Sequence, residues 1–349
     1  MKRLLTVLVL TPVMLFASSA LAADREYFDP AKAYAVIAGV LEFQDPGFSG
    51  WSKEKRKDRE LHDTLVKMGV PAGNMTLLLD KDATRANIEK AVAEVAAKAG
   101  KGSTFIFYYA GHGMKQPGGK TYFANYDVAG KDIAGTGLAV DKVGELIKVN
   151  FKGKRVLLWA DCCYSGALGG IAEALGKAGI PAASVTSADA SNTSTNNWTF
   201  TMTVIHTLAG QGQADRNHDG KVTLAEMNTE VADAMKYRDS QKSGFFTHAV
   251  AGGLVFAEVA VESISSVKWK GWPEPAAYVK ATHNGKEEAG QVVSRKGDKY
   301  AVEFWSYNDI AREELTADAL KRIKYVTYSA GDEVDVLWGG QLYKARILK

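Results

Sequence analysis

The sequence has few of the features that mark fibrous, disordered or strongly charged proteins. Its 349 residues include only two cysteines and eight prolines, and 43 Lys and Arg are nearly balanced by 40 Asp and Glu. The balanced charge argues against a polybasic arm for nucleic acid, and a hydrophobic content of 46% argues against a disordered chain. The length predicts about two domains, each large enough to bury a core.

Only the N-terminal stretch is apolar over many residues. Two basic residues precede an apolar run over residues 4–17, and Ala-Leu-Ala follows at 20–22. This pattern is typical of a secretory signal peptide, which we place at residues 1–22. The alternative is a permanent membrane anchor, but the run is shorter than the roughly 18–20 residues that span a bilayer, and Pro12 interrupts it. We therefore expect a secreted or periplasmic protein without a membrane anchor after signal cleavage.

Signal cleavage changes the charge very little. The two basic residues before the apolar run are the only charged residues of the segment, so the net charge falls from +3 to +1. A charge so close to zero gives no long-range attraction to nucleic acid or to membranes. We expect no nucleic-acid partner.

The two cysteines, Cys162 and Cys163, are neighbours in the sequence. Adjacent cysteines rarely bridge each other without strain, so they do not predict a structural disulfide. Two free thiols side by side in an exported protein need another explanation, and a role in a chemical reaction is the strongest one.

Apolar runs alternate with segments of helical spacing through the first two thirds of the chain. Strands are predicted at residues 34–40, 75–79, 104–109, 154–159 and 182–186, and helices at 59–68, 85–98, 140–149 and 171–177. Strands that are apolar on both faces and separated by helices predict a mostly parallel α/β sheet covered on both sides. In such sheets ligands bind beyond the carboxyl ends of the strands.

Two of these strand ends carry reactive side chains. Residues 104–109 lead into Ala-Gly-His112-Gly113, and residues 154–159 lead into Ala-Asp161-Cys-Cys163-Tyr-Ser-Gly. Parallel strands would bring the imidazole and the thiol to one edge of the sheet. A neutral imidazole can take the proton of a thiol and so create the thiolate that attacks a carbonyl carbon.

These paired motifs resemble those of the caspase-like cysteine peptidases, and the metacaspase and bacterial orthocaspase branch is the most similar. The resemblance extends over about residues 30–258 and includes the opening strand and Asp58. It implies a caspase-like α/β fold, a mostly parallel sheet flanked by helices, which we place at residues 24–258.

The resemblance also implies the roles of the motif residues. His112 matches the catalytic histidine and Cys163 the nucleophile, while the backbone N–H groups of Gly113 and Cys163 would form the oxyanion hole. Cys162 would be a packing residue or a second thiol. The alternatives are a histidine satisfied within the core and a buried, unreactive thiol.

Two acids would set the specificity. The resemblance implies that Asp161 lies at the floor of the first specificity pocket (S1) and that Asp58 lines the same pocket. Two carboxylates favour Arg or Lys there and repel Asp. We therefore expect protein or peptide substrates with a basic residue before the cleaved bond. As alternatives, Asp58 would be a solvated acid in a charged segment, and Asp161 a strand-end cap.

Residues 215–226 match the twelve-residue EF-hand loop. The side chains expected to chelate Ca²⁺ are Asp215, Asn217, Asp219, Thr223 and Glu226, with Gly220 at the sharp turn and the backbone carbonyl of Lys221 as a further ligand. Helices are expected at residues 202–209 and 224–236. EF-hands usually occur in pairs, so a lone loop predicts weak binding, with a Kd of about 10⁻⁴–10⁻³ M. The alternative is a turn rich in Asp and Asn that binds nothing.

The pattern changes after Phe256. A linker rich in Trp and Pro is predicted at residues 259–275, followed by short alternating strands over 276–349. This last part resembles a small SH3-like or Tudor-like barrel. Its aromatic residues could bind a cationic or peptide ligand, although such residues more often fill the core of a small barrel. The sequence does not indicate the partner of this barrel.

Together these features predict an exported, calcium-binding cysteine endopeptidase that cleaves after Arg or Lys through a thioester acyl-enzyme. The alternative is a scaffold of caspase fold without catalytic activity, which would use the C-terminal barrel to bind a partner. A scaffold has no need of both His112 and Cys163.

Overall fold

The structure, a computed structural model, describes residues 26–259, 269–306, 309–323, 331, 333–338 and 341–346. The predicted signal peptide lies outside these residues, as does most of the predicted linker. Among the described helices, none combines the length and the apolar character needed to cross a membrane.

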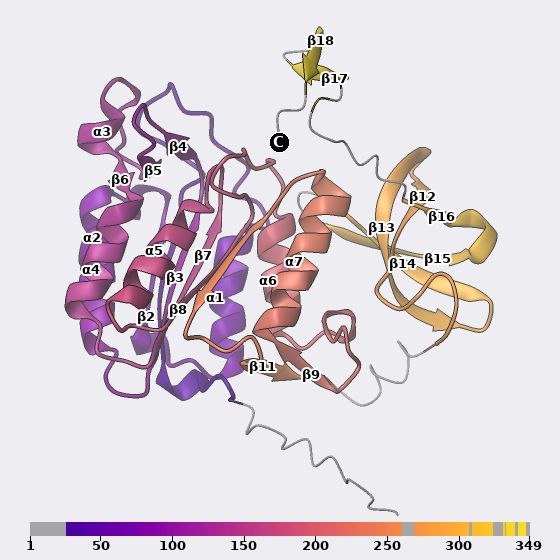
Figure 1. The fold of residues 1–349 in the computed structure, drawn as a ribbon, viewed down its shortest axis with the longest axis horizontal. Helices are drawn as coiled ribbons and strands as arrows, with labels where there is room; N and C mark the ends of the chain where they lie inside the picture. The colour runs from indigo at the N-terminus through magenta and orange to yellow at the C-terminus, as the bar shows by residue number, and fades with distance from the viewer. Residues whose placement is uncertain are drawn as a thin grey trace, which may run out of the picture.

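A six-stranded sheet forms the centre of the larger domain (Figure 1). Its strand order is β10-β8-β7-β3-β1-β2. The strands are β1 (Ala33–Gly39), β2 (Met75–Leu79), β3 (Thr104–Ala110), β7 (Arg155–Asp161), β8 (Ala182–Thr186) and β10 (Gly244–His248). All are parallel except β10, which pairs antiparallel with β8 at the edge.

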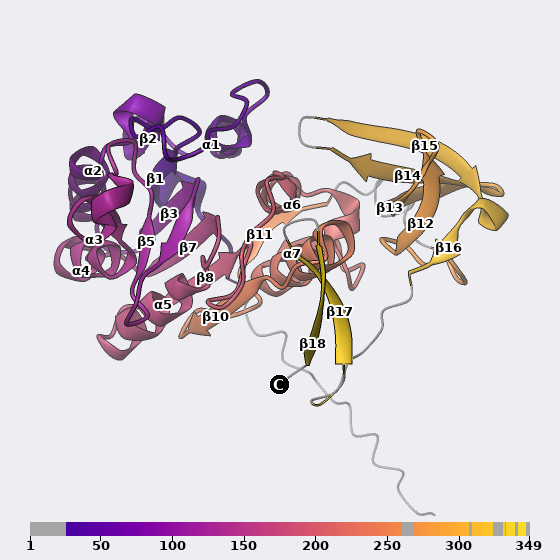
Figure 2. The same ribbon diagram turned by 90° about the horizontal axis from the view of Figure 1, so that it is seen from above.

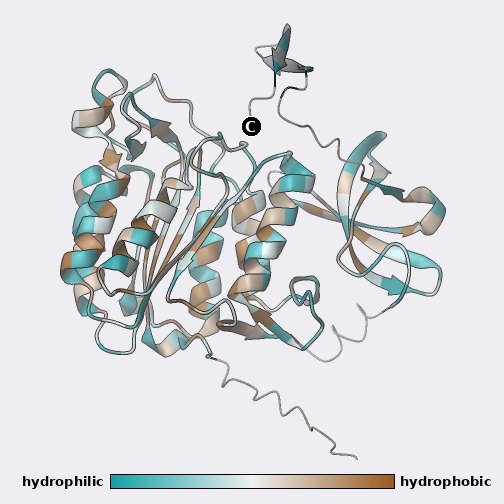
Figure 3. Cartoon of the chain, viewed as in Figure 1, coloured by the Kyte–Doolittle hydropathy of each residue, from teal (hydrophilic) through white to brown (hydrophobic). Residues whose placement is uncertain are grey.

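Helices cover both faces of this sheet. The residues of one core come from β1, β3 and β7 together with α1 (Lys57–Met68), α6 (Thr199–Leu208) and α7 (Leu224–Asp239). The second core, on the opposite face, includes residues of α2 (Arg85–Lys98), α4 (Val140–Asn150) and α5 (Ala167–Lys177). Apolar colour gathers on the strands and on the helix sides toward them (Figure 3). The prediction of a mostly parallel sheet between two helical layers is therefore confirmed.

Strands β3 and β7 are buried along their whole length, because each is covered on both faces. Their register pairs Tyr109 with Ala160 and Ala110 with Asp161. The His112 and Cys163 motifs, which directly follow these strand ends, are therefore neighbours at one edge of the sheet.

Short elements complete this domain. Strands β4 (Gly113–Lys115), β5 (Thr121–Phe123) and β6 (Leu138–Ala139) form a small sheet, and helix α3 covers Ile133–Thr136. Strand β9 (Lys221–Thr223), within the predicted calcium loop, pairs antiparallel with β11 (Val255–Glu258).

The C-terminal part is all-β and antiparallel, in the order β15-β14-β13-β12-β16. Its strands are β12 (Tyr278–His283), β13 (Lys286–Lys296), β14 (Lys299–Trp305), β15 (Ile310–Thr316) and β16 (Lys321–Arg322). Val279, Val292, Val302 and Phe304 lie in its core. Among the described residues, β17 (Glu333–Trp338) and β18 (Gln341–Arg346) pair only with each other. The sequence analysis predicted a single barrel over residues 276–349, but this hairpin is separate from the five-stranded sheet.

The five-stranded sheet packs against α6 and α7 (Figure 2). The ring of Trp305 lies 4.9 Å from that of His206 and 4.1 Å from the guanidinium of Arg238. The Tyr278 hydroxyl donates a 3.0 Å hydrogen bond to the buried carboxylate of Glu230. Trp305, one of the aromatic residues considered as a ligand surface, is therefore used in packing between the two parts of the chain.

Candidate active site

A cavity opens at the carboxyl ends of β3 and β7. Strand β3 leads into Gly111 and His112 on its wall, and β7 leads into Asp161, Cys162 and Cys163. The opposite wall comes from Leu41, Trp51 and the segment 194–198, which lies between β8 and α6. The structure thus brings the predicted base and the predicted nucleophile to one cavity.

A backbone carbonyl holds the imidazole of His112. The distance from its Nε2 to the carbonyl oxygen of Ser49 is 2.8 Å. A carbonyl oxygen only accepts hydrogen bonds, so Nε2 carries the proton and the lone pair is on Nδ1. The ring of Trp51 lies 4.3 Å from the imidazole, with Phe43 and Phe48 also close.

These surroundings also set the charge of the imidazole. Burial lowers the pKa of His112, and the hydrogen bond to Ser49 offsets part of this effect. The ring is therefore neutral at pH 7 and has a free Nδ1 lone pair, which is the form that a general base requires.

The two glycines beside His112 let the chain turn closely around the strand ends. Gly111 has φ +150°, and a Cβ there would meet the Tyr109 hydroxyl at 2.5 Å. A Cβ on Gly113 would lie 1.8 Å from the carbonyl oxygen of Cys163. The backbone of the histidine motif therefore touches the backbone of the cysteine motif.

The two cysteines have different surroundings. Cys163 is half-buried, and its Sγ accepts a 3.2 Å hydrogen bond from the backbone N–H of Ser194. Cys162 is 2% exposed, and burial raises the pKa of its thiol well above the ordinary value. Of the two thiols, Cys163 is the one suited to react.

Asp161 lies on the cavity wall but is almost fully buried. Its Oδ2 accepts hydrogen bonds from the Thr201 hydroxyl at 2.6 Å and from the Thr201 backbone N–H at 3.3 Å, both on α6. Burial raises the pKa of Asp161 to about 7, despite these hydrogen bonds. A cationic ligand in the cavity would favour its charged form.

Asp58 does not line this cavity, in contrast to the expectation from the sequence. It is fully buried in the first turn of α1, and Arg56 forms 2.7 Å hydrogen bonds to both of its oxygens. The same guanidinium also binds Asp80 at 2.7 Å. Because Arg56 occupies both oxygens, Asp58 supports the fold and does not face a ligand.

Sequence reasoning missed two parts of this site. The first is Ser49, which contributes a backbone carbonyl that any residue type could supply. The second is the polar segment 194–198, whose Ser, Thr and Asn residues are typical of any surface loop. Neither leaves a signal in residue type or spacing.

The predicted calcium loop forms a compact turn at the start of α7. Asp215 is 1% exposed and accepts hydrogen bonds from the N–H groups of Asp219 and Gly220, at 3.0 and 2.8 Å. Glu226 accepts from the N–H groups of Arg216 and Thr223 at 3.1 and 2.9 Å, so its carboxylate points into the loop.

The remaining loop residues agree with the EF-hand pattern in part. Gly220 has φ +85°, as the sixth position requires, and Asn217 donates to Asp219 at 3.1 Å. Thr223 and Lys221 lie on β9, paired with β11. Among the described residues, however, no three His, Cys, Asp or Glu side chains converge as a metal site. The donor types and the turn at Gly220 fit Ca²⁺.

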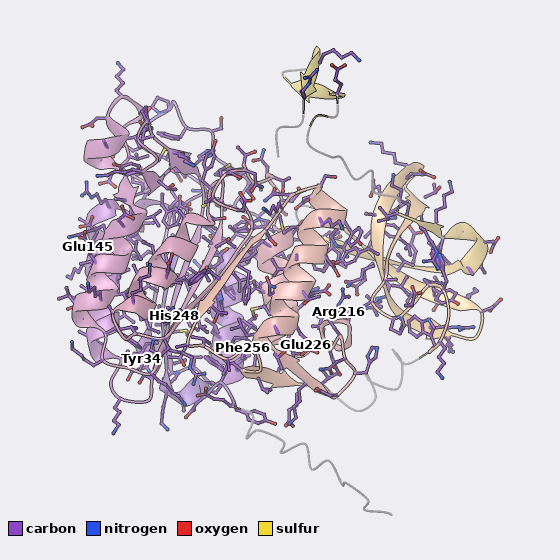
Figure 4. All side chains as sticks on the ribbon, viewed as in Figure 1. Tyr34, Glu145, Arg216, Glu226, His248 and Phe256 are labelled. Atoms are coloured by element: carbon purple, nitrogen blue, oxygen red, sulfur yellow. The ribbon has the colours of Figure 1, made fainter. Side chains whose placement is uncertain are left out.

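Arg216, the second residue of this loop, connects it to the C-terminal sheet (Figure 4). Its guanidinium binds the Ala276 carbonyl at 3.3 Å, lies 3.3 Å from Glu230 and also pairs with Asp233. The loop is therefore held from both sides, by β11 and by the segment that leads into β12.

The chain was compared with curated proteins, solved structures and family models. No curated protein matches the chain. A solved structure from Geobacter sulfurreducens is 17% identical, covers 65% of this chain and 99% of its own, and has a TM-score of 0.45. Caspase-1 from Spodoptera frugiperda is 14% identical, covers 68% of this chain and 94% of its own, and has a TM-score of 0.44. The family model of the caspase domain matches residues 33–263, so the chain belongs to the caspase-domain family of cysteine peptidases.

Proposed function

We propose that this protein is an exported cysteine endopeptidase that binds calcium and cleaves after Arg or Lys, with Cys163 as nucleophile and His112 as general base. The observation that carries the proposal is the shared cavity: both side chains lie on its wall, each at the end of a buried strand. The Ser49 carbonyl holds His112 in the tautomer that has Nδ1 free.

The reaction follows from this arrangement. His112 Nδ1 takes the thiol proton as Cys163 Sγ attacks the substrate carbonyl carbon, and the backbone N–H groups of Gly113 and Cys163 stabilise the oxyanion. The C–N bond then breaks, and His112 returns the proton to the leaving amine. Water, deprotonated by His112, hydrolyses the resulting thioester and releases the acid product and the thiol.

The preference for basic residues is supported by Asp161. It is a carboxylate on the cavity wall, and Thr201 holds it in place. A guanidinium or ammonium beside it gains a charge-assisted interaction, whereas a substrate Asp would be repelled. The proposed substrates are therefore proteins or peptides with Arg or Lys before the cleaved bond.

Calcium binding is supported by the loop 215–226. Asp215, Asn217, Asp219, Thr223 and Glu226 would supply side-chain oxygens, and Lys221 its backbone carbonyl. Because the loop contains β9 and the first turn of α7, a bound calcium ion would stabilise this part of the fold and take no part in bond cleavage. Export is proposed from the N-terminal sequence, and a calcium-rich exterior suits a weak site.

Hydrolysis of fluorogenic peptides ending in Arg, Lys or Asp tests this proposal. The assay compares millimolar calcium with chelator, under reducing conditions, and uses Cys163→Ala as the control. We expect cleavage after Arg or Lys that is lost in Cys163→Ala. If the reduced, calcium-loaded protein cleaves none of these peptides, the scaffold alternative replaces the peptidase.

A further inference from the structure

Residues 41–51 form a closed loop just after β1. The Trp51 N–H donates a 2.9 Å hydrogen bond to the Leu41 carbonyl, so the first and last residues of the loop meet. A Cβ on Gly50 would lie 2.5 Å from the same carbonyl oxygen, so the two ends approach each other closely. Compact loops whose ends meet are frequently functional.

Further hydrogen bonds fix the loop 41–51 on the rest of the domain. The Gln44 N–H donates to the Tyr126 carbonyl at 2.9 Å. One carboxylate oxygen of Asp45 accepts from the Gly130 N–H at 2.7 Å, and the other accepts from the Gly47 N–H at 2.8 Å, within the loop. The loop therefore presents its side chains from a fixed backbone.

Three aromatic rings of this loop surround the imidazole of His112. The centroid of the Trp51 ring lies 4.3 Å from that of the imidazole, with 40° between the two planes. The rings of Phe43 and Phe48 follow at 5.1 and 5.8 Å. The same loop supplies the Ser49 carbonyl, which binds Nε2. One segment thus gives the imidazole both its hydrogen-bond acceptor and its apolar neighbours.

The hydrogen bond alone does not orient the imidazole. It fixes Nε2 and leaves the ring free to turn about the line to the Ser49 oxygen. An aromatic ring packed beside the imidazole removes this freedom, because aromatic pairs prefer particular geometries. Trp51 is the nearest of the three rings, and it also lines the cavity that contains Cys163. It is therefore placed to hold the ring and to limit the access of water.

We propose that Trp51 is a positioning residue for the general base, which holds the His112 imidazole on the Ser49 carbonyl and shields its Nε2–H from water. This proposal rests on the peptidase function proposed above. Trp51 gives and takes no proton in the reaction. Its loss should therefore slow the chemical steps without changing which substrate side chain is preferred.

Trp51→Leu tests the aromatic contact and keeps an apolar side chain beside the core that Trp51 touches. The measurement is kcat for a peptide ending in Arg and for the same peptide ending in citrulline, which is isosteric with Arg and neutral. We expect kcat to fall about tenfold for both peptides, equivalent to about 1.4 kcal/mol. Trp51→Phe keeps an aromatic ring and should restore most of this loss.

Two control variants accompany this test. Phe48→Leu removes the farthest of the three rings and should lower kcat less than Trp51→Leu does. Phe245→Leu removes an exposed ring from β10, at the edge of the sheet, and should leave kcat unchanged. An effect of Trp51→Leu no larger than that of Phe245→Leu would overturn the proposal. A larger loss for the Arg peptide than for the citrulline peptide would also overturn it, because Trp51 would then act on the substrate cation.

An NMR measurement separates this inference from catalysis. In the Cys163→Ala protein, ¹⁵N-edited spectra follow the Nε2–H proton of His112, whose signal depends on how fast it exchanges with water. We expect exchange to become at least about tenfold faster when Trp51→Leu is added, and to stay slow with Trp51→Phe. This result supports the positioning role even if the unmodified protein cleaves no peptide, whereas equal exchange with and without Trp51→Leu overturns it. If Trp51→Leu does not fold, Trp51→Met takes its place with the same expectation, since its flexible side chain fills irregular gaps.

Discussion

A methyl group on Gly113 would lie 1.8 Å from the carbonyl oxygen of Cys163. This oxygen belongs to the backbone, so it cannot turn aside as a side chain would. The absence of a side chain at Gly113 is therefore what allows the histidine and cysteine motifs to approach each other.

Gly113→Ala should consequently damage the site through geometry alone. We expect peptidase activity to fall at least about 100-fold, since a displacement of about 1 Å in an active site has an effect of this size. Stability should fall by about 1–3 kcal/mol, as for other overpacked positions. Gly170→Ala, on α5 with no atom within 4 Å of the added Cβ, is the control and should be neutral or slightly stabilising. Full activity in Gly113→Ala would contradict this view of the site.

The two thiols should differ in reactivity. Cys163→Ala is expected to abolish peptide hydrolysis, whereas Cys162→Ala should retain it within a few-fold, because the Cys162 thiol is buried and its pKa is raised. Mass spectrometry after brief alkylation at neutral pH should find the label on Cys163. Preferential labelling of Cys162, or an inactive but folded Cys162→Ala, would assign the nucleophile to the other residue.

The pH dependence should separate binding from chemistry. The pKa of Asp161 is raised to about 7, so lowering the pH through 7 protonates this carboxyl and removes its attraction for Arg. The pKa of His112 is lowered by burial, so the base remains neutral at this pH and loses function only in more acidic solution. Between pH 7 and 6 we expect KM for an Arg peptide to rise up to about fivefold, because the charged fraction of a carboxyl with a pKa of about 7 falls from one half to about one tenth.

A neutral substrate provides the control for this profile. The citrulline peptide gains nothing from the charge of Asp161, so its KM should stay constant over the same range. If KM rises equally for both peptides, another group is responsible for the titration.

Calcium should stabilise the protein through residues 215–226. At a concentration one hundred times the Kd, the added stability is about 2.7 kcal/mol, which corresponds to a rise of several degrees in melting temperature. Glu226→Gln removes a charge expected to bind calcium and keeps an oxygen for the Thr223 N–H. Differential scanning calorimetry should show the calcium-dependent rise in the unmodified protein and its loss in Glu226→Gln. An equal rise in both would place calcium elsewhere.

The α/β fold and the two motifs could be predicted because apolar strands and the residues that follow them are local features of the sequence. Apolar runs such as residues 104–109 show a strand buried on both faces, and the motifs with His112 and Cys163 follow directly in the chain. Parallel pairing then brings strand ends together whatever the exact register.

The other parts of the site depend on contacts that sequence patterns do not show. The hydrogen bond from His112 to Ser49 spans 63 residues and uses a backbone atom. The segment 194–198 meets the nucleophile through the hydrogen bond from the Ser194 N–H to Cys163 Sγ, across 31 residues. Asp58 is an acid at the position that the motif predicts. Its partner Arg56 is one of several charged residues in that segment, so the sequence does not show that the two form an ion pair.

The packing of Trp305 on the larger domain has a consequence for how the molecule unfolds. The side chain comes from the C-terminal sheet, yet it packs with the core formed by α1, α6 and α7. A chain shortened after residue 263, where the caspase-domain match ends, would leave this patch of α6 and α7 open to water. The five-stranded sheet therefore shields this patch of the caspase domain from water, and we expect the two parts to unfold in a single cooperative transition.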